Sequence, residues 1–255
     1  MFLAIDVGNT HTVMGLYAGE DLVHEWRIRS VPERTEDEMR ALLADLFRER
    51  ELLVGDVRGS AIASVIPRVT GPVISAVRKL VGVEVLEING NSEVGIENRY
   101  LHPENVGADR LANAVGGVER YGAPLIIVDM GTATTFDVVS EDRAYVGGII
   151  LPGLEMSADA LYQKTSLLPR IAIDNPGPVV GRSTIQSITS GIMRGTVAAI
   201  DGLIEQVREE IGHPDCRVIA TGGHSRKIAR LSRHIETVDS DLTLFGILRI
   251  WQRNQ

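Results

Sequence analysis

The chain has 255 residues, of which 44% are hydrophobic and 24% are charged. This composition is typical of a globular protein and excludes an intrinsically disordered one. The net charge of −8, without a cluster of Lys and Arg, argues against a nucleic-acid-binding protein, because affinity for a phosphate backbone comes from clustered cations. The length suits two domains of ordinary size.

Three features of the chain bear on its compartment. Cys216 is the single cysteine, which excludes an intramolecular disulfide and a multi-thiolate metal site within one subunit. The N-terminal residues 1–6 lack the basic region of a signal peptide, and an acid interrupts their apolar run. The sequence contains no apolar run of the roughly 18 residues that a membrane-spanning helix needs. We therefore expect a cytoplasmic protein that does not bind membranes.

The first third of the chain predicts a strand meander followed by alternating helices and strands. Apolar residues at helical spacing follow Thr35, which predicts a helix over 35–51 with Thr35 as N-cap and Glu38 completing a capping box. The other elements expected here are strands at 2–6, 12–17, 22–28, 60–65 and 83–88, and a helix at 69–81.

The rest of the chain begins with a polar, irregular segment, 89–103, which we expect to be a loop that meets a ligand. A second group of three strands then repeats the opening pattern. The expected elements are helices at 106–121, 185–211 and 245–251, and strands at 125–129, 134–139, 144–150 and 217–221. This alternation predicts an α/β fold.

An internal repeat is the most informative feature of the sequence. Residues 5–12 and 128–135 both read apolar-Asp-x-Gly-x-x-x-Thr, each between the first two strands of its group. The glycine permits a tight turn whose N–H groups can face phosphate oxygens, and the Asp suits a cation or its water. A common hairpin turn explains either copy alone, but two copies in matching contexts favour phosphate binding. The P-loop and Rossmann motifs are both absent from the sequence.

Four segments together resemble the type III pantothenate kinases, which belong to the superfamily of acetate and sugar kinases, heat-shock chaperones and actin: Asp6–Thr10, Gly107–Arg110, Asp129–Thr134 and Gly147–Gly153. The resemblance covers nearly the whole chain. It implies an α/β protein of two similar actin-like ATPase-type domains, 1–115 and 116–255. Each would contain a ribonuclease H-like mixed sheet flanked by helices, with the nucleotide cleft between them.

The resemblance also implies the functional residues. The residues it implies for nucleotide binding are Asp6, Val7, Gly8, Asn9, Thr10, His11, Thr12, Val13 and Thr132. The residues it implies for substrate binding are Tyr100, Gly107, Ala108, Asp109, Arg110 and Thr184. Asp109 is implied to be the catalytic base, although on the residues alone it is equally an acid favoured by a helix dipole. Arg110 offers a forked donor for a substrate carboxylate, and a surface ion pair is its alternative.

The implied reaction transfers a phosphoryl group from ATP, with Mg²⁺, to pantothenate, giving 4′-phosphopantothenate in the first step of coenzyme A biosynthesis. The resemblance further implies K⁺ or NH₄⁺ at Asp129 and a homodimer. Alternatives are a kinase for another small acid or sugar, a polyphosphate hydrolase, and a nucleotide-binding transcriptional accessory protein on the same fold.

Other residue types add little chemistry. The six histidines form no i, i+4 pair and have no neighbouring cysteine, so we expect no transition-metal site. Cys216 has no local His–acid arrangement and is predicted to be a structural thiol. The pair Gly222-Gly223 fits either a plain turn or a close approach to adenine or ribose.

Overall fold

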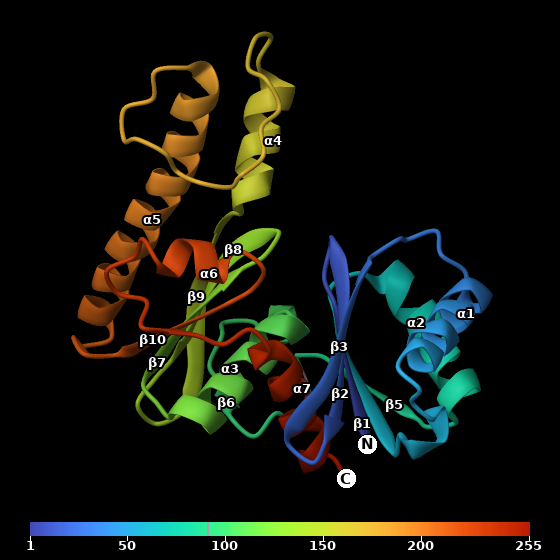
Figure 1. Cartoon of the computed structure of the whole chain (residues 1–255). Coiled ribbons are helices and arrows are strands. Elements are labelled where there is room, and N and C mark those ends of the chain that lie inside the picture. Colours follow the sequence, from blue (N-terminus) through green and yellow to red (C-terminus); the bar gives the residue numbers. More distant parts are fainter. Residues whose placement is uncertain (91) are drawn as a thin grey trace. The chain divides into compact units, whose positions relative to one another are not determined.

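A computed structural model of the chain describes residues 1–90 and 92–255 (Figure 1). The chain forms two compact units. Unit 1 contains Met1–Arg120 and Asp241–Gln255, and unit 2 contains Tyr121–Ser240. Residue 91 of the expected loop 89–103 lies outside the described residues, and the rest of that loop includes a two-residue strand, β6 (Glu97–Asn98), and the start of a short 3-10 helix, Pro103–Asn105.

Unit 1 is built on a mixed five-stranded sheet with the strand order β3–β2–β1–β4–β5. The central strand β1 pairs antiparallel with β2 and parallel with β4, and five of its six residues are buried. The strands are β1 (Phe2–Val7), β2 (His11–Ala18), β3 (Asp21–Arg29), β4 (Gly59–Ser64) and β5 (Val85–Ile88). The opening meander is therefore confirmed.

The helices of unit 1 are α1 (Glu36–Glu49), α2 (Pro67–Val81), α3 (Ala108–Tyr121) and α7 (Leu242–Arg253), with a 3-10 helix at Val54–Asp56. Helix α1 begins as predicted: the Thr35 side chain accepts from the Glu38 N–H, and Glu38 accepts from the Thr35 N–H at 2.8 Å. Apolar faces of α1 and α2 form one core with β1. Leu3 and Ile5 of β1 are fully buried in this core.

Helix α7 packs against α3 through two glycines. A Cβ atom at Gly246 would overlap the Ala112 carbonyl oxygen, and one at Gly116 would lie 2.7 Å from the Leu242 carbonyl oxygen. Arg120 of α3 donates to both carboxylate oxygens of Asp241, at 3.1 and 2.8 Å. The last helix of the chain is thus an integral part of unit 1.

Glu119 of α3 adds a second ionic connection to α7. It accepts hydrogen bonds from Arg249 and Arg253 at 3.0 and 2.8 Å. Burial raises the pKa of Glu119, but these two hydrogen bonds outweigh burial and leave its pKa below the ordinary value. The carboxylate therefore stays ionised between its two arginine partners at neutral pH.

Unit 2 repeats the architecture of unit 1. Its strands lie in the order β11–β10–β7–β8–β9, which matches β5–β4–β1–β2–β3 of unit 1 one for one. β7 pairs antiparallel with β8 and parallel with β10, as β1 does with β2 and β4. The strands are β7 (Leu125–Met130), β8 (Ala133–Val139), β9 (Ala144–Pro152), β10 (Arg217–Thr221) and β11 (Thr237–Val238). The predicted α/β duplication is confirmed.

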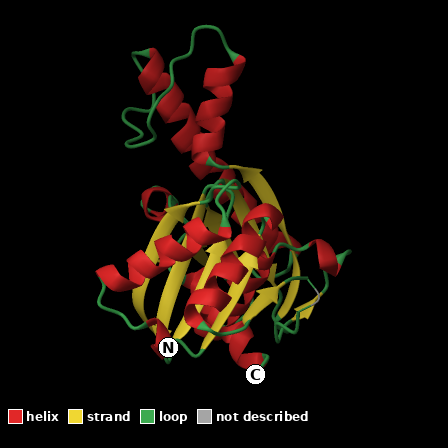
Figure 2. Ribbon diagram, turned by 90° about the vertical axis from the view of Figure 1, so that its right-hand side faces the viewer, coloured by secondary structure: helices red, strands yellow, loops and turns green. Residues whose placement is uncertain are grey.

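The helices of unit 2 are α4 (Leu154–Lys164), α5 (Thr184–Glu210) and α6 (Ser225–Ala229). α5 was expected, whereas α4, α6 and β11 were not. α6 has five residues and β11 has two, which is too short for a periodic pattern. α4 begins after Gly153 without a side-chain cap, so its start carries no capping signal. Figure 2 shows strands flanked by helices.

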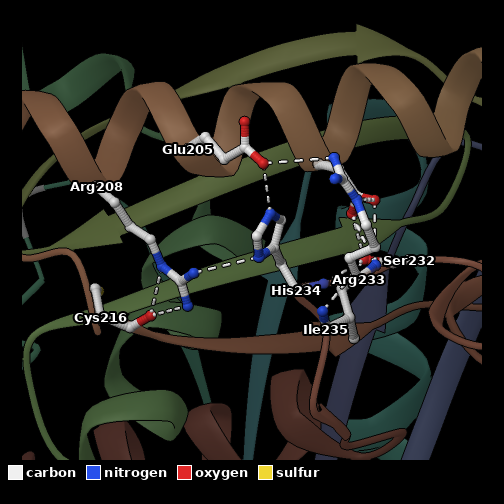
Figure 3. A network of polar contacts seen from close by, with 8 residues as sticks. Glu205, Arg208, Cys216, Ser232, Arg233, His234 and Ile235 are labelled. Atoms are coloured by element: carbon white, nitrogen blue, oxygen red, sulfur yellow. Dashed lines mark hydrogen bonds and ion pairs between the residues drawn. The ribbon is translucent and has the colours of Figure 1, made fainter.

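Polar contacts connect residues 232–234, just before β11, to helix α5 (Figure 3). The imidazole of His234 lies 2.9 Å from Glu205 Oε1 and 3.3 Å from an Arg208 nitrogen. Asp201, buried on α5, accepts from the hydroxyl of Ser232 at 2.5 Å and from the Arg233 N–H at 3.1 Å. This segment therefore has a defined place although it carries little regular structure.

The compact units do not follow the expected ranges 1–115 and 116–255. Helix α3 stays with unit 1 up to Arg120, and residues 241–255 return to unit 1 because α7 packs on β1 and β4. The two ranges remain a prediction as domain assignments. No helix among the described residues is long and apolar enough to cross a bilayer.

Candidate active site

The first glycine turn connects β1 to β2 in unit 1. Asp6 lies half-buried at the end of β1, whereas Asn9, Thr10 and His11 are exposed. The Gly8 N–H donates to the His11 carbonyl at 3.0 Å, which closes the turn. The predicted nucleotide segment 6–13 is thus one continuous strand-turn-strand whose tip faces solvent.

Ser30, just beyond β3, supports this turn from behind. Its hydroxyl donates to the Gly8 carbonyl at 2.7 Å and lies 2.9 Å from the Thr12 hydroxyl. Its N–H donates to the Thr10 carbonyl at 3.1 Å. We did not predict this residue, although a three-strand meander returns the end of its third strand to the first turn and so gives a usable signal.

The second glycine turn connects β7 to β8 in unit 2 and has the same design. Asp129 is half-buried, Gly131 and Thr132 are exposed, and the Gly131 N–H donates to the Ala133 carbonyl at 3.0 Å. The turn is one residue shorter than the first, since β2 begins three residues after Gly8 and β8 begins two residues after Gly131.

This difference corrects the sequence alignment of the repeat. Thr12 lies opposite Val7, and the equivalent position opposite Met130 is Thr134. Both threonines are buried, with exposed fractions of 1% and 2%. Thr134 rather than Thr135 is therefore the structural counterpart of Thr12.

Two glycines lie directly against the second turn. A Cβ atom at Gly153 would lie 2.7 Å from the Gly131 carbonyl oxygen, and the Gly153 N–H donates to the Thr132 carbonyl at 3.2 Å. Gly222, at φ +88°, lies so close that a Cβ atom would overlap the Asp129 carboxylate. Glycine is thus required at both positions, and packing on Asp129 accounts for Gly222.

The donors around Asp129 fit a hard cation. The carboxylate and the nearby turn carbonyls supply oxygen ligands only, which suits K⁺ or Mg²⁺ better than a transition metal. Among the described residues, no three His, Cys, Asp or Glu side chains gather into a metal-binding cluster. A cation at this place would therefore take part of its coordination from backbone, water or a bound phosphate.

Asp109 lies in the first turn of α3, in unit 1. Its Oδ1 accepts a hydrogen bond from the Arg110 N–H at 2.8 Å. A Cβ atom at Gly107 would lie 2.5 Å from the same oxygen, so Gly107 leaves the space that the carboxylate occupies. Burial raises the pKa of Asp109, while the hydrogen bond and charge of Arg110 oppose the rise. A carboxylate with a raised pKa is better suited to accept a proton near neutral pH.

The other predicted substrate residues divide between the units. Arg110 is only 8% exposed, so its side chain is buried rather than lying on the surface. Tyr100 is half-buried, and its N–H donates to Asn98 at 3.1 Å. Thr184 lies in unit 2, exposed as the first residue of α5, whose N-cap is Ser183.

Two other residues, Cys216 and His224, have side chains that could take part in chemistry. Burial raises the pKa of the Cys216 thiol to about 11, so this residue is no thiolate nucleophile at neutral pH. The backbone N–H of His224 donates to the Met130 carbonyl at 3.1 Å. The imidazole Nε2 of His224 lies 3.5 Å from a carboxylate oxygen of Glu155. Burial lowers the pKa of His224; the charge of Glu155 opposes this shift and the charge of Lys227 adds to it, and the lowered pKa favours the neutral imidazole.

Comparison with known proteins identifies the family. The family model described as type III pantothenate kinase matches residues 2–206. A type III pantothenate kinase from Exiguobacterium sp. is 42% identical over 255 residues, covering 100% of both chains. The chain belongs to the type III pantothenate kinase family. A member from Thermomicrobium roseum is 41% identical over 253 residues and covers 99% of this chain and 97% of its own.

Solved structures agree with the fold at low sequence identity. A protein from Campylobacter jejuni described as a Baf family transcriptional activator superposes with a TM-score of 0.60 at 18% identity, covering 99% of this chain and 98% of its own. An inorganic polyphosphate/ATP-glucomannokinase from Arthrobacter sp. strain KM gives a TM-score of 0.50 at 13% identity, covering 99% and 98%. The fold is thus shared by this pantothenate kinase family and a sugar kinase.

Proposed function

We propose that the chain phosphorylates pantothenate with ATP to give 4′-phosphopantothenate. Full-length relatives that carry this name at about 40% identity support the reaction. The observation that carries the assignment of residues is the half-buried carboxylate of Asp109, which has a raised pKa and directly precedes a buried arginine. Phosphoryl transfer to an alcohol needs such a group to orient the hydroxyl and accept its proton.

Each part of the reaction has a candidate residue in this chain. Asp109 accepts the proton of the pantothenate hydroxyl, and Arg110 pairs with the pantothenate carboxylate. The N–H groups and hydroxyls of segment 6–13 and of Thr132 bind the phosphates of ATP. Tyr100, Gly107, Ala108 and Thr184 complete the substrate contacts.

Cations belong to the same proposal. Asp129 would hold K⁺ or NH₄⁺, and Asp6 would face the water around the Mg²⁺ that accompanies ATP. When bound, these ions offset the negative charge of the phosphates. The chain's own contribution is to place two half-buried carboxylates at the ends of equivalent strands, β1 and β7.

The proposal predicts potassium-dependent turnover. We expect ADP release with pantothenate and K⁺, and at least about tenfold less when Na⁺ replaces K⁺, because the cation proposed at Asp129 is K⁺ or NH₄⁺. A coupled ADP assay with a panel of small acids and sugars measures both. ATP binding without turnover on any member of the panel would instead favour a regulatory protein, and turnover on another acceptor a different kinase.

We further propose a cytoplasmic homodimer formed through the exposed apolar surface of unit 2. Helix α4, the following loop and the start of α5 extend away from the rest of unit 2 in Figures 1 and 2. Large apolar side chains are exposed along this extension, with Leu167 at 91% and Val180 at 78%. The set is Met156, Leu161, Tyr162, Leu167, Val179, Val180 and Ile185. An exposed apolar surface of this kind is typical of a protein interface.

The dimer can be tested by adding charge to this surface. The double variant Leu167→Asp, Val180→Asp is expected to sediment as a 27.7 kDa monomer, whereas the wild type sediments at twice that mass. Dimer formation would bury two carboxylates per subunit in an apolar interface, and the cost of removing them from water should prevent association. Val23→Asp, at an exposed position on β3 of unit 1, is the control and should leave the mass unchanged. A monomeric wild type would contradict the proposal.

A further inference from the structure

The segment between Lys164 and Thr184 contains no helix or strand. Loops longer than about 12–15 residues without secondary structure are uncommon in compact domains and are usually either functional segments or linkers. This loop, 165–183, ends at Ser183, the N-cap of α5, and so leads directly to Thr184, the predicted pantothenate contact. Whatever fixes the loop therefore also bears on the position of Thr184.

The loop is fixed by side chains that donate to its backbone carbonyls. Ser190 and Arg194 of α5 donate to the carbonyls of Val179 and Gly177 at 2.7 and 2.8 Å. Both donors lie on α5, the helix that directly follows the loop in the sequence. They hold the last part of the loop against α5.

Lys227 anchors the middle of the loop from a different element, α6. Its Nζ donates to the Ile173 carbonyl at 2.8 Å and lies 3.3 Å from Oδ1 of Asp174. Ile173 is buried in the same core as Ile228 of α6. Because the Asp174 side chain is 82% exposed, its ion pair with Lys227 contributes little to stability. The charged hydrogen bond from Lys227 to the Ile173 carbonyl is therefore the main attachment.

The position of Lys227 in α6 connects this anchor to the second glycine turn. Helix α6 begins shortly after Gly222, with His224 as its N-cap. Gly222 packs against Asp129, and the His224 N–H donates to the Met130 carbonyl. α6 is thus held at the glycine turn through its start and holds loop 165–183 through Lys227.

We propose that Lys227 is a positioning residue for pantothenate: by fixing the Ile173 carbonyl it sets the path of loop 165–183 and hence the place of Thr184. The inference rests on the proposed function, since Thr184 is a substrate contact only within it. In this proposal Lys227 acts through the loop and makes no contact with substrate or ATP. Its loss should therefore raise KM for pantothenate and leave kcat and KM for ATP nearly unchanged.

The test compares three variants of the full-length chain. Lys227→Met removes the ammonium and keeps the aliphatic stem, and we expect KM for pantothenate to rise about tenfold, as the loss of a charged hydrogen bond predicts. Lys227→Arg retains a donor and should recover most of this loss. Arg226→Met, at the exposed neighbouring position of α6, is the matched control and should behave as wild type.

Two further readouts separate this inference from the proposed function. Tryptic cleavage after Arg170, inside the loop, should be faster in Lys227→Met, and sedimentation should show an unchanged mass. An unchanged KM for pantothenate, an equal rise in KM for ATP, an equal effect of Arg226→Met, or a changed mass would overturn the role of Lys227. If the wild type does not use pantothenate at all, the proposed function fails, and unaltered tryptic cleavage would then also overturn the anchor.

Discussion

Replacing Asp109 with Asn is expected to lower kcat with pantothenate at least about a hundredfold, because the amide cannot accept the proton of the hydroxyl. Folding should be little affected, since Asn preserves the size of the side chain and can still accept the Arg110 N–H. Steady-state ADP release and a thermal melt measure the two effects. Turnover at the wild-type rate in this variant would remove Asp109 from the mechanism.

The pH dependence gives a second measure of the same residue. The ionised carboxylate is the active form of a base, and burial raises the pKa of Asp109 above its ordinary value. Activity should therefore fall, as the pH is lowered, at a higher pH than an exposed aspartate would give. Asp45→Asn, at an exposed position on α1, is the control and should retain the wild-type rate and pH profile.

Replacing Gly246 with Ala should strongly destabilise the protein. The added methyl group would overlap the Ala112 carbonyl oxygen and lie 2.5 Å from its carbonyl carbon, both backbone atoms of α3 that no rotamer change can move. We expect a loss of about 3 kcal/mol in the free energy of unfolding, or about 6–12 °C in Tm.

The matched control for Gly246 is Gly195→Ala in α5, an exposed helical position where a Cβ atom meets no other atom within 4 Å. Ala stabilises an exposed helical position by up to about 1 kcal/mol relative to Gly, so the control should melt at the wild-type temperature or slightly above it. Equal melting temperatures for Gly246→Ala and wild type would show that α3 and α7 do not pack as closely as described.

The parts of the fold that repeat in the sequence were predictable. Strands at the glycine turns alternate or form short apolar runs, and Thr35 with Glu38 marked the start of α1. Helix α6 and strand β11 are too short to show a periodic pattern, so tertiary contacts define them. The position of α7 depends on the packing of Gly246 against α3 and of Gly116 against α7. These residues are far apart in the sequence, so no local sequence pattern predicts their contact.

The candidate site shows the same division. The Asp-x-Gly turns were visible because the glycine and the acid are local in sequence. Supporting residues such as Ser30 and Gly222 act through contacts with segments more than twenty residues away, so only the structure places them beside Gly8 and Asp129. The roles of Asp109, Arg110 and Thr184 in catalysis and binding remain predictions.

Because α7 completes unit 1, the two units differ in when they can finish folding during synthesis. Unit 2 is one uninterrupted stretch, 121–240, and all of it has been translated before the last fifteen residues are made. Unit 1 has to wait for its final helix, although its sheet is translated first. A released chain that ends at residue 240 should therefore contain a protease-resistant unit 2 together with an open unit 1 whose buried face on β1 is still uncovered.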